Sequence, residues 1–78
     1  SAVTIDSSRA IYVVDRANNR VQKWSVGAFT GVTVAGSASG TAGSTNSFLS
    51  TPRDVDPDSN GNLYIADAAN HRVVLWNV

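Results

Sequence analysis

The sequence predicts an all-β fold built from two copies of one structural unit. Residues 11–26 align without a gap to residues 63–78. Runs rich in Val, Ile, Tyr and Trp are separated by turn residues about every eight to twelve positions, which is typical of short strands. Residues 36–52 form the only window long enough for a helix, and they are too rich in Gly, Ser and Thr to form one.

The two copies are offset by 52 residues, and half of the sixteen aligned pairs are identical. Chance does not give such agreement, so the chain contains a duplicated unit. Further upstream we expect Ile5-Asp6 to match Val55-Asp56, with two extra residues in the second copy. The identical pairs are Tyr12/Tyr64, Asp15/Asp67, Ala17/Ala69, Asn18/Asn70, Arg20/Arg72, Val21/Val73, Trp24/Trp76 and Val26/Val78.

Seven strands are expected. In the first unit they cover residues 2–6, 11–15, 20–26 and 31–35, and in the second residues 53–56, 63–67 and 72–78. Four antiparallel strands that repeat every 40 to 50 residues are typical of β-propeller blades. We therefore expect one blade at residues 1–35, a long loop at 36–52, and a second blade at 53–78 that lacks its outermost strand.

The residue pattern of the repeated unit resembles the NHL repeat. The second unit has Pro52 and Asp56, then GNLYIAD (residues 61–67) and NHRV (residues 70–73). The first unit has YVVD (residues 12–15) and NNRV (residues 18–21), but Arg9-Ala10 where the family favours Gly-Asn. The resemblance implies a propeller, most often of six blades, that binds protein, RNA or other ligands, usually without catalysis.

The repeated polar residues have structural interpretations. Asp15 and Arg20 flank a four-residue turn, as do Asp67 and Arg72, so each pair can meet across a hairpin. Asn18 and Asn70 suit a left-handed turn position, which Asn tolerates well. The large side chains Tyr12, Tyr64, Trp24 and Trp76 are expected to pack one blade on the next.

Three motifs resemble reactive or metal-binding sites. The Gly/Ser-rich residues 36–44 follow a strand but have neither the Lys nor the helix of a phosphate-binding loop, so we expect a flexible loop pinned by Phe48 and Leu49. Asp56, Asp58 and Asn60 have calcium-loop spacing, but Tyr64 occupies the ninth position, so we expect a polar hairpin turn and only a weak calcium candidate. His71 has Asn19 at its repeat position, and we expect no catalysis through it.

Composition excludes several classes of function. Six Lys and Arg residues balance six acidic residues, so nothing favours nucleic acid or an anionic membrane surface. Without Cys the chain has no disulfide or thiolate metal site, and we expect no cofactor. No apolar run approaches the length of a membrane span. The cellular compartment is not indicated.

We expect a non-catalytic module that binds a protein or a small polar ligand on one loop face. Strand alternation places the hairpin turns 15–20 and 67–72 on the same face as the long loop. The candidate binding residues there are Arg16, Asn18, Arg20, Asn70, His71 and Arg72. The alternative is a fragment of a propeller enzyme such as a metal-dependent amidating lyase.

Two blades leave sheet faces that no neighbour covers within one molecule. We therefore expect self-assembly into a closed homo-oligomeric ring, a C3 trimer with six blades first and a tetramer with eight second. The last strand, residues 72–78, forms an apolar edge. We expect it to be covered by a strand of another molecule, or to be the cut end of a longer propeller.

Overall fold

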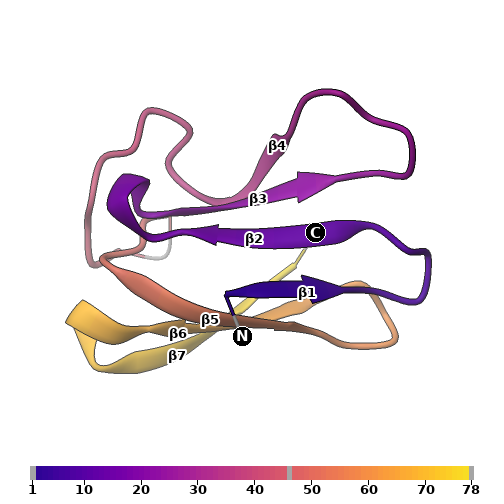
Figure 1. Ribbon diagram of the computed structural model, residues 1–78. Helices are drawn as coiled ribbons and strands as arrows, with labels where there is room; N and C mark the ends of the chain where they lie inside the picture. Colours follow the sequence, from indigo (N-terminus) through magenta and orange to yellow (C-terminus); the bar gives the residue numbers. More distant parts are fainter. Residues whose placement is uncertain (1, 46, 78) are drawn as a thin grey trace.

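The computed structural model describes residues 2–45 and 47–77, which form two antiparallel sheets packed against each other (Figure 1). The first sheet has four strands in sequential order, and the second has three. The strands are β1 (Val3–Ile5), β2 (Ile11–Asp15), β3 (Arg20–Trp24) and β4 (Val32–Gly36), then β5 (Pro52–Pro57), β6 (Leu63–Asp67) and β7 (Arg72–Trp76). One-turn 3₁₀ helices, η1 (Arg16–Asn18) and η2 (Ala68–Asn70), close the β2–β3 and β6–β7 hairpins.

All seven expected strands are present; two have the expected bounds, and the ends of the others differ by one to two residues. Strand β3 stops at Trp24, because the Ala28 amide donates to the Ser25 carbonyl and closes a turn that contains Gly27 at φ +78°. Strand β4 runs one residue beyond the expected end, to Gly36. Strand β7 likewise ends at Trp76, and the expected terminal residue Val78 lies outside the described residues.

The offset of 52 holds along the whole unit, so the expected two-residue insertion is wrong. Val3 pairs with Val13 in the first sheet, and Val55 pairs with Ile65 in the second. The turns that follow also match, since the Asp6 amide donates to the Ala10 carbonyl and the Asp58 amide to the Asn62 carbonyl. Asp6 is therefore the equivalent of Asp58 and not of Asp56. The match of Ile5-Asp6 to Val55-Asp56 indicated the wrong offset, because an apolar residue followed by Asp is a short pattern that recurs at nearby positions of a strand.

The core lies between the two sheets. The first sheet contributes Tyr12 and Val21, and the second contributes Leu63 and Ile65. Alternation along each strand turns the neighbouring side chains outward, so Ile11 and Tyr64 are exposed. The whole buried cluster consists of Ala10, Tyr12, Val21, Ala35, Leu49, Val55, Leu63 and Ile65.

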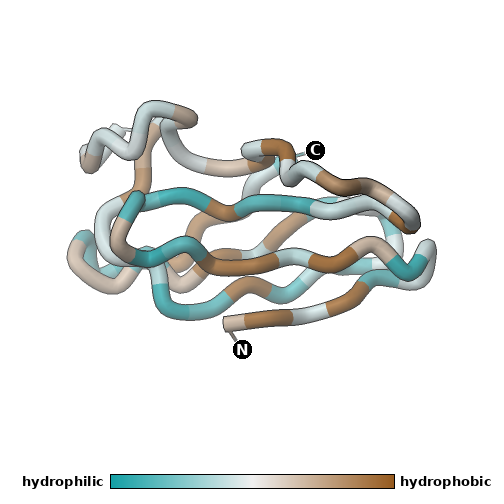
Figure 2. Tube along the Cα trace, turned by 45° about the horizontal axis from the view of Figure 1, so that its top comes forward, coloured by the Kyte–Doolittle hydropathy of each residue, from teal (hydrophilic) through white to brown (hydrophobic). Residues whose placement is uncertain are grey.

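Only half of the expected aromatic packing occurs between the two sheets. Tyr12 is buried and Trp76 packs against the core, whereas Tyr64 is exposed and Trp24 lies on the outer face with Ile5 and Ile11. The reason is that each sheet packs against one other sheet within the chain and uses the opposite face to do so. Equivalent side chains of the two units therefore contact the other sheet in only one of the two copies. Figure 2 shows hydrophobic positions along β1, beside the N label, at the outside of the molecule.

The loops lie at the ends that strand alternation predicts. The β2–β3 and β6–β7 turns share one end with the loop between β4 and β5, and the other connections lie at the opposite end (Figure 1). None of the helices in the described part of the chain has the length and apolar character that crossing a bilayer requires.

Candidate functional site

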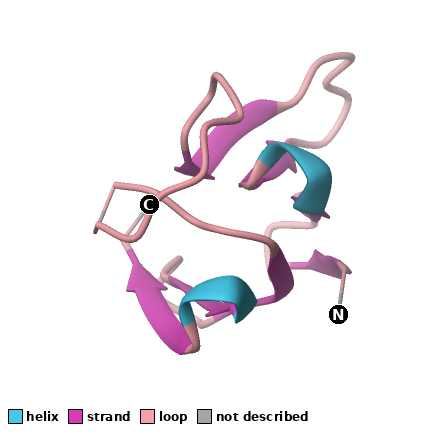
Figure 3. Ribbon diagram, turned by 90° about the vertical axis from the view of Figure 1, so that its left-hand side faces the viewer, coloured by secondary structure: helices cyan, strands magenta, loops and turns pink. Residues whose placement is uncertain are grey.

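The end that carries η1, η2 and the loop of residues 37–51 is named here the loop face. Figure 3 looks onto it and shows both short helices beside the loop. All six candidate binding residues belong to the η1 and η2 turns or directly follow them, so the structure brings them to this face. Most of their polar groups form hydrogen bonds within the chain, as described below.

Asp67 is the centre of the second hairpin. It is fully buried, and its carboxylate accepts hydrogen bonds from the Ser50 amide at 2.6 Å, the Asn70 side chain at 2.8 Å and Arg72 Nε at 2.8 Å. The Arg72 guanidinium also donates to the carbonyls of Ser44, Thr45 and Phe48 at 3.0 to 3.1 Å. The predicted ion pair is thus confirmed, and it also ties the long loop to the second sheet.

Asp15 repeats this arrangement in a more exposed setting. Arg20 Nε donates to its carboxylate at 2.9 Å, and the side chain of Asp15 remains 29% exposed. The hydrogen bonds from Asn18, together with those from Arg20, lower the pKa of Asp15 despite partial burial. Arg20 also donates to the Ala38 carbonyl at 2.9 Å.

The predicted left-handed conformation of Asn18 and Asn70 is wrong. Both end a 3₁₀ turn, and their side chains donate to the aspartate of the same hairpin. The left-handed residues are the next ones, Asn19 at φ +54° and His71 at φ +53°. The 3₁₀ turn occupies three residues after the aspartate, which moves the left-handed position one residue later.

Asn19 is a site residue that the sequence did not single out. Its side-chain amide donates to the Gly40 carbonyl at 3.1 Å, and its oxygen accepts the Thr51 amide at 2.9 Å. It therefore ties both ends of the loop to the first sheet. The sequence signal for this role is that the first unit has Asn19 at the repeat position where the second unit has His71.

The loop itself follows the sequence prediction in part. Leu49 is fully buried in the core and Phe48 is half-buried beside Gly43, so these residues pin the loop as expected. No helix follows residues 36–44 within the described chain. The hydrogen bonds from Asn19, Arg20 and Arg72 restrain the loop at further points, beyond the two apolar anchors that the sequence indicates.

Two exposed arginines remain at the junction of the sheets. Arg16 of η1 and Arg53 of β5 line a cavity of about 250 Å³, together with Ala2, Val14 and Pro52. Arginine keeps its charge at any physiological pH, and its planar fork of donors matches carboxylate and phosphate oxygens. His71 is also exposed on the loop face. This cavity is the part of the loop face whose chemistry suits an anionic group.

Comparison with known families gives one match. Residues 49–74, which include β5, η2 and most of β6–β7, match the family model of the NHL repeat. The chain contains an NHL repeat. No curated protein matches the chain. The first unit lies outside the matched segment, and the internal repeat relates it to the second at a constant offset of 52 residues.

The two antiparallel sheets of this NHL repeat chain are consistent with propeller blades. They stack face to face, with β5 against β1 and β2, and β4 is the last strand of the first sheet. The second sheet ends at β7 and has three strands in the described residues, as the sequence predicts.

The weak calcium candidate is a turn built around Asp58. One of its carboxylate oxygens accepts the backbone amides of Asn60 at 2.8 Å and Asn62 at 2.9 Å. Burial raises the pKa of Asp58, but the hydrogen bonds from Asn62 and Asn60 outweigh it and lower the pKa overall. Asp56 lies on β5 opposite Tyr64 and is exposed. Among the described residues no three His, Cys, Asp or Glu side chains gather as metal ligands would.

Asp6 builds the same turn in the first unit, which has no calcium-like spacing. Its carboxylate accepts the amides of Ser8 and Ala10 and the hydroxyl of Tyr12, the last at 2.8 Å. The Tyr12 hydrogen bond lowers the pKa of Asp6, while burial and Asp6 raise the pKa of Tyr12 to about 12. The aspartate of this turn therefore stabilises the turn through its hydrogen bonds in both units.

Proposed function

We propose that the chain is a non-catalytic propeller module that closes into a ring by stacking copies of itself head to tail. One observation carries the proposal: residues buried in one unit are exposed at the equivalent position of the other. Val21 is fully buried and Val73 is 72% exposed, while Val55 is 1% exposed and Val3 is 57% exposed. Tyr12 and Leu63 are buried, whereas their equivalents Tyr64 and Ile11 are exposed.

These exposed residues form two faces that complement each other. The outer face of the first sheet carries Val3 and Ile11, the equivalents of the second sheet's buried Val55 and Leu63. The outer face of the second sheet carries Tyr64 and Val73, the equivalents of the first sheet's buried Tyr12 and Val21. The contact between the sheets within the chain is therefore a template for the contact between chains.

Burial of these side chains supplies the driving force. Each large apolar side chain removed from water contributes about 1.5–3 kcal/mol. A cavity of about 610 Å³ lined by Ile11 and Trp24 opens on the first outer face and offers room for a side chain of the neighbouring copy. The contact joins two different surfaces, so copies add in one direction until the rotation closes. We favour a C3 trimer with six blades, and a tetramer with eight is the second choice.

Two blocked variants test the head-to-tail contact. Val3→Asp places a charge on the first outer face, and Val73→Asp places one on the second. Both residues are exposed in the single chain, so each variant should fold. We expect the unmodified chain to have the mass of about three chains by light scattering, and each variant alone to be a monomer.

Mixing the two variants should give a heterodimer that grows no further. The Val3→Asp chain keeps its second face and the Val73→Asp chain keeps its first, so one productive contact remains. Phe29→Ser is the matched control, because Phe29 is fully exposed in the β3–β4 loop and should leave the ring intact. A folded monomer of the unmodified chain at micromolar concentration, or variants that stay monomeric on mixing, would contradict the proposal.

The loop face is proposed to bind an acidic group through Arg16 and Arg53. The cavity they line lies at the junction of the two sheets, so a ring of three chains would carry three such sites. Titration with a short aspartate- and glutamate-rich peptide should shift the NMR signals of both arginine side chains. The Arg16→Ala, Arg53→Ala double variant should lose the response. If both proteins respond equally, the site lies elsewhere.

Absence of catalysis is part of the proposal, and the amidating lyase fragment remains its alternative. Such an enzyme holds its metal with residues from several blades, so the assembled form is the one to assay. Metal analysis of the purified ring, and turnover of an amidating lyase substrate with and without chelator, distinguishes the two. Chelator-sensitive turnover would favour the enzyme.

A further inference from the structure

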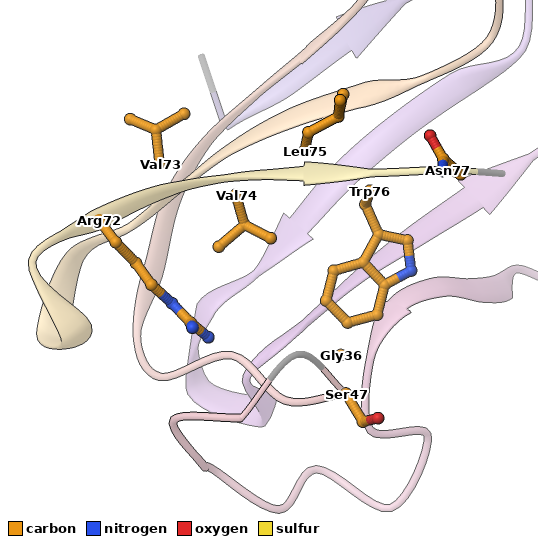
Figure 4. A pocket seen from close by; sticks show the side chains of 8 residues that line it. All are labelled: Gly36, Ser47, Arg72, Val73, Val74, Leu75, Trp76 and Asn77. Carbon is orange, nitrogen blue, oxygen red and sulfur yellow. The ribbon is translucent and has the colours of Figure 1, made fainter.

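The cavity between Arg16 and Arg53 holds the two arginines of the loop face that the fold itself does not use. Arg20 and Arg72 are paired with the aspartates of their own hairpins. Figure 4 shows the Arg72 side chain extending from β7 toward the loop, whose carbonyls it also contacts. Within the described residues, no ion pair or side-chain hydrogen bond engages Arg16 or Arg53, and both are exposed. Their charges are therefore available to a ligand.

Neither of these two arginines belongs to the repeated pattern. The offset of 52 places Ala68 at the position of Arg16 and Ser1 at the position of Arg53. By contrast, the Asp–Arg pairs that close the hairpins are identical in both units. The short helices η1 and η2 have the same form with Arg or with Ala as their first residue. A blade of this kind therefore folds without the two arginines, which points to a role in binding.

A β-bulge sets the position of Arg53. The pairing of β5 with β6 shifts register between Pro52 and Asp54, so Arg53 is the extra residue of the bulge. Bulges of this kind re-aim a side chain. Arg53 lines the same cavity as Arg16, which comes from the other unit. The stacking of the two sheets thus brings two cationic side chains from different units to one space.

The rest of this cavity is apolar. The side chains of Ala2, Val14 and Pro52 complete its lining, and none of them has a polar atom. Asp54 does not line the cavity, and its carboxylate accepts the amide of the next residue. The volume of about 250 Å³ lies below the roughly 300–1,000 Å³ of most small-molecule sites. The space suits one small apolar group that carries a single anionic group.

A carboxylate at the end of a peptide chain fits this combination best. Its two oxygens match the donor forks of two guanidinium groups. A phosphate has a third acceptor oxygen and more charge, and the apolar walls offer it no further donor. In a C-terminal residue the carboxylate and the side chain leave the same Cα, so one can contact the arginines while the other contacts the walls. The carboxylate of Asp or Glu has no apolar side chain beside it.

We propose that this cavity binds the free C-terminal carboxylate of a peptide or protein whose last residue is small and apolar, such as valine. Arg16 and Arg53 hold the carboxylate oxygens, and the apolar walls contact the last side chain. Capture of a chain end through its carboxylate is a recurrent mode of peptide recognition. The inference rests on the proposed binding of an anionic group at this site and names the ligand of that site.

The test titrates capped peptides into the unmodified chain and follows the arginine Nε–Hε signals and the Val14 methyl signals by NMR. The cavity lies within one chain, so the result does not depend on ring formation. Acetyl-Gly-Gly-Val with a free carboxylate should saturate one site per chain and shift the Arg16, Arg53 and Val14 signals. Its C-terminal amide should not bind. Acetyl-Gly-Gly-Gly with a free carboxylate should bind about tenfold more weakly, because the contact of the valine side chain is lost.

Single variants separate the site from a general effect of charge. Arg16→Ala and Arg53→Ala should each weaken binding of the valine peptide by about tenfold or more, since each removes a charged donor. Arg9→Ala is the matched control, because Arg9 is an exposed arginine that lines a different cavity. It removes the same charge and should leave binding unchanged. Equal weakening by all three variants would contradict the proposal.

The peptide series also distinguishes this inference from the proposal on which it rests. If the aspartate- and glutamate-rich peptide shifts both arginines but the valine carboxylate binds no better than its amide, only the present inference is wrong. If neither peptide shifts the arginines, both proposals are wrong. Inorganic phosphate that binds these arginines more tightly than the valine peptide does would overturn the assignment to a carboxylate.

Discussion

Asp15 and Asp67 occupy one repeat position in two different environments. Both pair with the arginine five residues later, yet Asp67 is fully buried and also bonds the Ser50 amide of the loop. Removal of a buried acceptor leaves its donors without a partner, whereas exposed ion pairs contribute little. Burial therefore decides how much each aspartate stabilises the fold.

We expect Asp67→Ala to lower the free energy of unfolding by about 1–3 kcal/mol, because the Ser50 amide and the Asn70 and Arg72 side chains lose a buried acceptor. The same substitution at Asp15 should lower it by about 1 kcal/mol or less. Urea denaturation of both variants in the Val3→Asp background measures this without the contribution of assembly. Equal effects would mean that the Ser50 contact and the burial of Asp67 add nothing. An unchanged melt with loss of ligand binding would instead assign these residues a functional role.

At the scale of single turns, Arg9 and Gly61 occupy equivalent left-handed positions. Arg9 has φ +69° and Gly61 has φ +85°. A Cβ atom added at Gly61 would meet nothing within 4 Å, so conformation alone decides the effect of a substitution there. Left-handed backbone is unfavourable for residues with a side chain by about 1–2 kcal/mol.

Arg9→Gly should therefore stabilise the chain by about 0.5–1 kcal/mol, since the gain is partly offset by the greater freedom of glycine when unfolded. Gly61→Ala should destabilise it by about 1 kcal/mol. Thermal and urea unfolding of the two variants provides the measurement. Effects of the same sign would show that side-chain contacts, and not backbone conformation, govern these turns.

The Asp58 turn also gives a prediction about metal. Its carboxylate is engaged by backbone amides, and Asp6 builds the same turn without calcium-like residue spacing. We expect calcium to be dispensable, so chelator should leave the melting temperature unchanged. A marked decrease that added calcium reverses would show that Asp56, Asp58 and Asn60 form a site. Asp58→Asn, with and without calcium, identifies which role its carboxylate has.

At the scale of the whole molecule, the stability of the chain should depend on its concentration. Folding buries one contact between sheets within the chain, and the proposed assembly would bury the equivalent contact between chains. Anything that binds only the folded state raises apparent stability by mass action. We expect the melting temperature of the unmodified chain to rise with protein concentration, and that of Val3→Asp to stay constant. A concentration-independent melt of the unmodified chain would argue against closure by stacking.

Local features of this chain were predictable from its sequence. Strands 11–15 and 63–67 have the expected bounds, and the Asp–Arg pairs meet across their hairpins. Two local predictions were wrong, the left-handed asparagines and the insertion before Tyr64. Both depended on the hydrogen-bonding register of a turn, which the 3₁₀ conformation of η1 and η2 and the Asp6 and Asp58 bonds decide.

The sequence by itself determined the duplicated unit, its strands and the side chains that close its hairpins, because these depend on residues a few positions apart. Only the tertiary structure decided which copy of each apolar residue is buried. Tyr12 and Tyr64 have the same local sequence and opposite exposure, since only one has a sheet beside it. The roles of Asn19, Arg20 and Arg72 in holding the loop were likewise decided by the stacking, which brings residues far apart in the sequence within hydrogen-bonding distance.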